Sequence, residues 1–189
     1  MIDQAQDIRK GEELNLSRLK NYLGEHLTGF SGQLEVSQFP SGFSNLTYLI
    51  KSGDKEYVLR RPPFGANIKG GHDMGREFKV LSLLKPVYPK VPTPMLHCVD
   101  ESVLGAEFYV MERVKGVILR GRPPKDIDLS PALMKSISES CIDNLANLHT
   151  MDLKASGLEG FGKPEGYTQR QVEGWIKRYY QAETDTLDS

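Results

Sequence analysis

The sequence has few cysteines, no long apolar run and almost no net charge. Its two cysteines, Cys98 and Cys141, cannot form a disulfide framework and lack the spacing of a metal site. The N-terminal stretch MIDQAQDIRKGEELN is polar, unlike a secretory signal, and no apolar run approaches the length of a membrane span. We therefore expect a cytoplasmic protein that has no membrane partner, with Cys141 as a small core residue of an amphipathic helix.

The net charge of −1 argues against a nucleic-acid partner, because such proteins normally carry a basic excess. The charge is nevertheless uneven, since nine basic residues face four acidic residues between Lys51 and Lys90. A local positive field suits a small polyanionic ligand. A solvated surface produces the same bias, so both interpretations stay open.

The apolar pattern predicts an α+β domain. Alternation predicts five strands, at residues 33–39, 45–51, 55–61, 95–100 and 106–114. Helical spacing predicts helices at residues 17–27, 75–85, 130–152 and 169–180. Strands joined by short hairpins form an antiparallel sheet, and a sheet followed by helices is the α+β arrangement. We expect three parts: an N-terminal helix and its lead (1–32), a sheet domain (33–113), and a linker with further helices (114–189).

The turn from Ser41 to Asn45 contains residue types that can contact phosphate. Gly42 allows a close approach of the backbone, so that N–H groups around Phe43 can point at phosphate oxygens. Ser44 and Asn45 add short hydrogen-bonding side chains. The same residues are common in turns that bind nothing, so this turn alone does not decide between the two interpretations.

A strand cation and a helix carboxylate follow the turn. Alternation places Val58 and Arg60 on one strand face, as an apolar floor with a cation beyond it, which suits a base and its phosphates. Glu77 heads the apolar stripe of the next helix, where a carboxylate is costly unless it is paired. Arg60 offers it a bidentate partner. Alternatively, Glu77 lies near solvent and stabilises the helix dipole.

The last feature is the stretch FYVMERVKG, an apolar strand that runs into a polar linker. Backbone groups at Glu112 and Val114 could hydrogen-bond a flat heterocycle there. Any strand end offers the same groups, so this feature is weak by itself.

In this order, the four features resemble the small lobe of a protein kinase. Their residues resemble the aminoglycoside phosphotransferase and choline kinase family, and within it the phosphotransferase-like proteins related to the N-terminal part of certain acyl-CoA dehydrogenases. The resemblance lies in SGFSNLTYLI, YVLRRPP, HDMGREFKVLSLL and FYVMERVKGVIL, and later in NLANLHTMD and GLEGFGKPEGYTQRQVEGWIKRY. It extends from about Leu16 to the last residue.

The resemblance implies a kinase-like fold, with residues 33–113 as the nucleotide-binding small lobe and 114–189 as the hinge and the first helices of an incomplete large lobe. It assigns Ser41, Gly42, Phe43, Ser44 and Asn45 to a loop over the ATP phosphates. Arg60 stands where a lysine is usual, with Glu77 as its partner. Met111 borders the adenine, beside the floor already expected of Val58, and the backbones of Glu112 and Val114 bind the adenine edge.

The chemistry of this superfamily also needs His-x-Asp-x-x-x-x-Asn and a second Asp for magnesium. None of the four histidines has an Asp two positions later. Asp126 and Asp128 precede a helix start, where capping explains them better. We therefore expect the nucleotide-binding half of an ATP-dependent phosphotransferase that acts on a hydroxyl group of an unknown small molecule. The chain alone should turn over little, with no catalytic or metal residue of its own and Mg²⁺ bound only in a longer protein. The alternatives are a non-catalytic module for a nucleotide or a partner, and a structural α+β domain.

Overall fold

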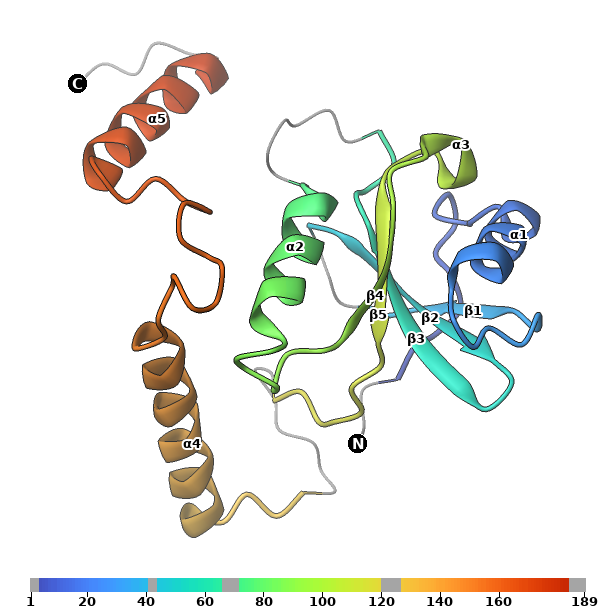
Figure 1. Cartoon of the computed structure of the whole chain (residues 1–189), viewed down its shortest axis with the longest axis horizontal. Coiled ribbons are helices and arrows are strands. Elements are labelled where there is room, and N and C mark those ends of the chain that lie inside the picture. Colours follow the sequence, from blue (N-terminus) through green and yellow to red (C-terminus); the bar gives the residue numbers. More distant parts are fainter. Residues whose placement is uncertain (1–3, 41–43, 66–71, 120–126, 184–189) are drawn as a thin grey trace. The chain divides into compact units, whose positions relative to one another are not determined.

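The computed structural model describes residues 4–40, 44–65, 72–119 and 127–183, and the chain divides into two compact units, 1–151 and 152–189. The strands are β1 (Glu35–Gln38), β2 (Leu46–Ser52), β3 (Lys55–Arg61), β4 (Pro94–Cys98) and β5 (Phe108–Glu112). The helices are α1 (Leu16–His26), α2 (Met74–Leu84), α3 (Glu101–Leu104), α4 (Pro131–His149) and α5 (Tyr167–Ala182). Figure 1 shows these elements along the chain.

The five strands form one antiparallel sheet in the order β1-β2-β3-β5-β4, as the sequence predicts for the strands and their direction. The turn between β2 and β3 needs a left-handed residue, and Gly53 supplies it with a φ of 59°. Pairing of β3 with β5 places Arg60 opposite Tyr109 and Val58 opposite Met111. This long-range pairing brings the residues of the candidate site together.

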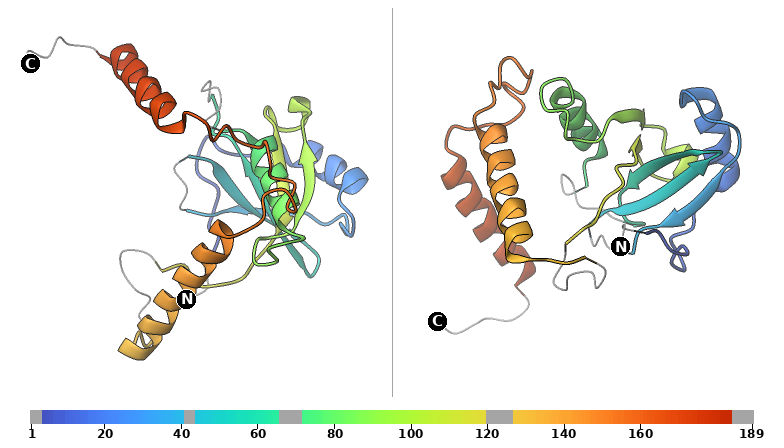
Figure 2. Two further views of the ribbon diagram at one scale, coloured as in Figure 1. Left: turned by 60° about the vertical axis from the view of Figure 1, so that its left-hand side comes forward. Right: turned by 90° about the horizontal axis from the view of Figure 1, so that it is seen from below.

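The two faces of the sheet are covered by different helices, with α1 on one side and α2 on the other (Figures 1 and 2). The α1 face carries the main hydrophobic core, in which Leu19 and Leu23 pack with Tyr48 and Leu59. The N-cap Asn15 starts α1 by accepting a hydrogen bond from the Arg18 N–H at 3.1 Å. The helix predicted at 17–27 is therefore part of the same core as the sheet. The opposite face of the sheet, which α2 covers, carries the candidate functional site.

Arg61 is an unusual member of the core face, because its side chain is fully buried. Its guanidinium donates to the carbonyl oxygens of Pro62 and Leu104, both at 3.1 Å, and lies 3.6 Å from the ring centre of Phe64. Burial lowers the pKa of the Arg61 guanidinium, while the neighbouring Tyr48 acts in the opposite direction. Carbonyl oxygens and an aromatic face thus replace water around this cation.

The later helices carry no buried residue. Cys141 is exposed on α4, so the prediction that it is a core residue is wrong. The physical reason is that the apolar stripe of α4 stays largely exposed among the described residues, where Leu145 is 48% exposed. On α5, Trp175 and Tyr180 are also mostly exposed. The short helix α3 was not predicted, since one turn leaves no periodic pattern.

Candidate functional site

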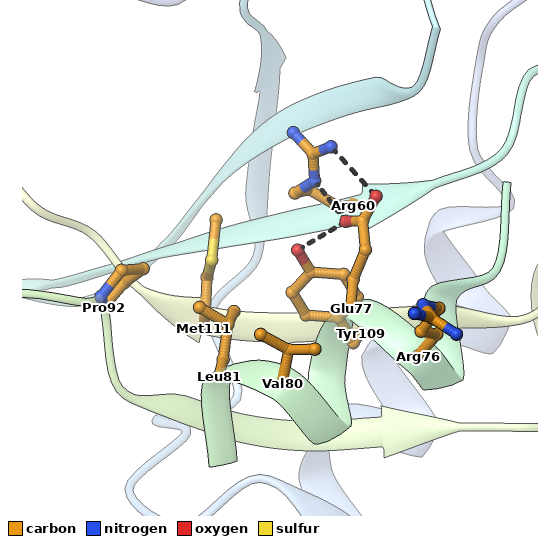
Figure 3. Close-up of a pocket in the computed structure, with 8 residues that line it drawn as sticks. All are labelled: Arg60, Arg76, Glu77, Val80, Leu81, Pro92, Tyr109 and Met111. Carbon is orange, nitrogen blue, oxygen red and sulfur yellow. Dashed lines mark hydrogen bonds and ion pairs between the residues drawn. The ribbon is translucent and has the colours of Figure 1, made fainter. Parts of the chain in front are cut away.

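The predicted ion pair between Arg60 and Glu77 is confirmed. The Arg60 Nε donates to Glu77 Oε2 at 3.0 Å, and Nη2 lies 3.4 Å from Oε1, so the contact is bidentate (Figure 3). Asp73 caps α2 by accepting from the Arg76 N–H, which sets Glu77 in the first helical turn. Both side chains are about one-third exposed, at 29% and 34%. The pair is therefore accessible to a ligand while it is held by the fold.

Two further side chains donate to the same carboxylate. The Tyr109 hydroxyl lies 2.9 Å from Glu77 Oε2, and the Asn45 amide Nδ2 lies 2.8 Å from Oε1. Burial raises the pKa of the Tyr109 phenol well above its usual range, and Glu77 adds to this shift while Arg60 opposes it. Tyr109 was not among the predicted site residues. Its position across from Arg60 depends on a β3–β5 register that no local pattern reveals.

A tight contact fixes the start of α2 against the sheet. The His97 Nε2 lies 2.6 Å from Glu107 Oε1, and the Phe78 ring stacks on His97 with centroids 5.1 Å apart. A Cβ atom at Gly75 would lie 2.9 Å from Glu107 Oε1. A Cβ atom at this position would therefore require the Glu107 carboxylate to shift.

A cavity of about 420 Å³ lies between α2 and β5, beside the ion pair (Figure 3). We call it the α2 cavity. Its walls are mostly apolar, with Val80 and Leu81 from the helix and Tyr109 and Met111 from the strand. Arg60 and Glu77 form its polar end.

A second cavity of about 310 Å³, which we call the hinge cavity, lies where β5 leaves the sheet. It is lined by five of the predicted residues, Val58, Arg60, Met111, Glu112 and Val114, with Phe39, Thr47, Lys90, Pro92, Arg113 and Ile118. Phe39, Leu49 and Val58 form a small buried apolar cluster on this face of the sheet. The two cavities share Arg60, Pro92 and Met111, so the cation borders both.

The hinge cavity offers backbone groups of defined polarity. The Glu112 N–H donates to the Thr93 carbonyl at 2.8 Å, and the Glu112 carboxylate accepts from the Thr93 hydroxyl and N–H. These bonds, with Lys85 nearby, lower the pKa of Glu112. The backbone of Glu112 can thus offer a ligand its carbonyl oxygen, whereas its donor is already used.

Of the five residues predicted to contact phosphate, the structure describes only two. Ser41, Gly42 and Phe43 fall outside the described residues, and Ser44 is exposed. Asn45 is only 6% exposed, and its amide faces Glu77 and His72. Whether these five residues contact phosphate stays a prediction.

The described residues include neither a cluster of metal-binding side chains nor a helix that could span a membrane. No three His, Cys, Asp or Glu side chains gather there in a way that could hold a metal ion. Among the helices described, none is long and apolar enough to cross a bilayer.

Comparison with known proteins gives consistent matches. The model of the phosphotransferase enzyme family matches residues 35–188. The chain is 40% identical to human acyl-CoA dehydrogenase family member 11 over 87% of its own length, and 37% identical to mouse acyl-CoA dehydrogenase family member 10 over 89%. It spans only 21% and 15% of those two relatives.

A solved structure gives the same result. A crystal structure of a Ralstonia eutropha protein that carries the provisional name aminoglycoside phosphotransferase superposes with a TM-score of 0.72 at 34% identity. The match covers 92% of this chain and 50% of that one. The kinase-like fold predicted from the motifs is confirmed by this likeness and by the five-stranded sheet.

Proposed function

The chain belongs to the phosphotransferase enzyme family, and from this premise we propose that it binds ATP for phosphoryl transfer to a hydroxyl group of a small molecule. The observation that carries the proposal is the Arg60–Glu77 ion pair beside a hinge cavity lined by Val58 and Met111. An apolar slot next to a fixed cation matches a flat base joined to phosphates.

The adenine base would occupy the hinge cavity. Its volume of about 310 Å³ is at the lower end of the range for ligand pockets, which suits the base and part of the ribose. The edge of adenine presents an amino donor and ring acceptors. The Glu112 carbonyl oxygen would accept from the amino group, and the Val114 N–H would donate to a ring nitrogen. Guanine presents an acceptor where adenine has the amino group, so this arrangement favours ATP over GTP.

The phosphates would meet Arg60. A guanidinium has five N–H donors, and Arg60 uses three of them on Glu77 and Thr47. Two donors remain for phosphate oxygens, while Glu77 holds the group in place. An arginine keeps the positive charge of the usual lysine and adds planar, directional donors. We retain the sequence-based proposal that residues 41–44 contact the phosphates.

The transfer step itself needs groups that the sequence does not supply in the expected pattern. No histidine is followed by an Asp two positions later, so no residue is assigned to accept the hydroxyl proton or to hold Mg²⁺. For the 189-residue chain alone we propose nucleotide binding with little turnover. On the same observation, a non-catalytic nucleotide-binding role is the second candidate.

Calorimetric titration of the chain with ATP tests the proposal. We expect saturable binding that is weaker with GTP and is weakened in Glu77→Gln. Glu25→Gln is the matched control, because this side chain is 74% exposed on the opposite face of the sheet and should leave the affinity unchanged. No heat and no thermal shift at about millimolar ATP would refute the proposal, because a bound ligand must stabilise the folded state.

A further inference from the structure

The Glu77 carboxylate joins three separate parts of the small lobe. Its donors are Arg60 on β3, Tyr109 on β5 and Asn45, which precedes β2. Each carboxylate oxygen accepts from two groups, so the carboxylate is fixed in position and orientation. Asn45 differs from the other two donors because it lies outside the strands, immediately before β2.

The amide of Asn45 is engaged at both ends. Its Nδ2 faces Glu77 Oε1 at 2.8 Å, and because a carboxylate only accepts, Nδ2 must be the donor. This assignment leaves Oδ1 as the acceptor, so the His72 Nδ1 at 2.7 Å must carry a proton and donate to it. The side chain is 6% exposed. Its short length and buried position direct it at α2 and not at a ligand in solvent.

We propose that Asn45 is a positioning residue that ties the start of β2 to α2 through Glu77, and that it acts on phosphate through Arg60 without touching phosphate itself. The inference rests on the proposed ATP site. When the Asn45–Glu77 bond forms, the start of β2, the start of α2 and the Arg60 guanidinium are held in one arrangement. When it is lost, the carboxylate can rotate, and Arg60 loses the orientation in which its remaining donors meet phosphate oxygens.

The first test is a double-mutant cycle on nucleotide affinity. We expect Asn45→Ala to weaken ATP binding about tenfold, which is the lower range for losing a hydrogen bond to a charged group. In a Glu77→Ala background, the same substitution should have no further effect, because the partner is already absent. Adenosine should bind wild type and Asn45→Ala equally, since it has no phosphates. Asn21→Ala, an exposed asparagine on α1, is the matched control and should leave both affinities unchanged.

The outcomes separate this inference from the proposed function. If wild type does not bind ATP, the proposed function fails before any variant is compared. If wild type binds ATP but Asn45→Ala weakens it equally in both backgrounds, Asn45 contacts phosphate directly and the inference fails alone. An unchanged ATP affinity in Asn45→Ala also overturns it, as does an equal loss for adenosine, which would indicate a general structural defect.

A second variant keeps the test informative if Asn45→Ala folds poorly. Asn45→Asp preserves the size of the side chain but places a carboxylate against that of Glu77. Two ionised carboxylates repel, so ATP affinity should fall at about pH 7.5 and recover in part near pH 5, where the pair can share a proton. Wild type should show no such recovery. An affinity of Asn45→Asp that matches wild type at every pH would contradict the contact with Glu77.

Discussion

Replacing Glu77 by glutamine should destabilise the sheet domain by about 2 to 3 kcal/mol. The ion pair with Arg60 contributes about 1 kcal/mol at most, because both side chains are about one-third exposed and solvent screens them. The larger loss comes from hydrogen bonding. Glutamine brings an NH₂ group to a place where Arg60, Tyr109 and Asn45 all donate, so at least one of these hydrogen bonds is lost, and a hydrogen bond to a charged group contributes about 1.5 to 3 kcal/mol.

The Asn45 amide could turn over to accept from the new NH₂ group, but this route has a cost. Its Nδ2 would then face His72 Nδ1, which now lies 2.7 Å from Oδ1 and would have to give up its proton. Such a rearrangement would reduce the destabilisation and move the proton to the other nitrogen of His72. NMR detection of the His72 tautomer would reveal it.

Hydrogen exchange of the β3 and β5 amides, followed at increasing urea concentration, is the suitable assay. Trp175 fluorescence would report mainly on the second unit, residues 152–189, and two units need not unfold together. The control Glu25→Gln should change the opening free energy by less than about 0.5 kcal/mol. If Glu77→Gln changed it as little, the carboxylate would be solvated and would hold nothing in place.

Three further predictions concern the buried polar groups. Tyr109→Phe removes one donor to Glu77 without leaving a group unpaired, so the opening free energy in the same exchange assay should fall by only about 1 to 2 kcal/mol. A decrease as large as that of Glu77→Gln would contradict this. Arg61→Ala removes the largest fully buried side chain and leaves the Leu104 carbonyl without its donor. It should lower the free energy of unfolding by about 2 to 4 kcal/mol, measured by urea unfolding followed by circular dichroism. A decrease under about 0.5 kcal/mol would show that water replaces the side chain. Burial raises the pKa of Tyr48 to about 12, so the neutral phenol stabilises the fold at and below the usual tyrosine pKa of about 10, and this stabilisation is lost as the pH rises from 10 through 12. The difference between the 295 nm titrations of wild type and Tyr48→Phe should show a phenol that ionises near pH 12. Ionisation near pH 10 would contradict the burial of Tyr48.

The sheet and the Arg60–Glu77 pair could be predicted because they depend on local patterns. Strand alternation fixes the face of Val58 and Arg60, and hairpin turns fix the antiparallel order of neighbouring strands. The position of Glu77 at the head of an apolar helical stripe indicated that it needs a partner. The preceding strand offered Arg60 as a bidentate partner, and the two do meet.

The rest of the site depends on contacts between distant parts of the sequence. Tyr109 joins the network only because β3 pairs with β5 in one register, which no spacing within either strand encodes. Asn45 was predicted to belong to a loop over the phosphates, and its buried contacts with Glu77 and His72 appear only when α2 is in place. The exposure of Cys141 was mispredicted for a related reason: an apolar stripe predicts which face needs cover and cannot supply the cover.

Nuclear magnetic resonance of the ¹⁵N-labelled chain during titration with ATP tests the nucleotide site most directly. The account predicts saturable shifts of the Val114 amide and the Arg60 Nε–H resonance, with those of α5 unchanged. Adenosine should shift Val114 and leave Arg60 in place. Shifts confined to other regions, or none at about millimolar ATP, would show that this cavity is not where the nucleotide binds.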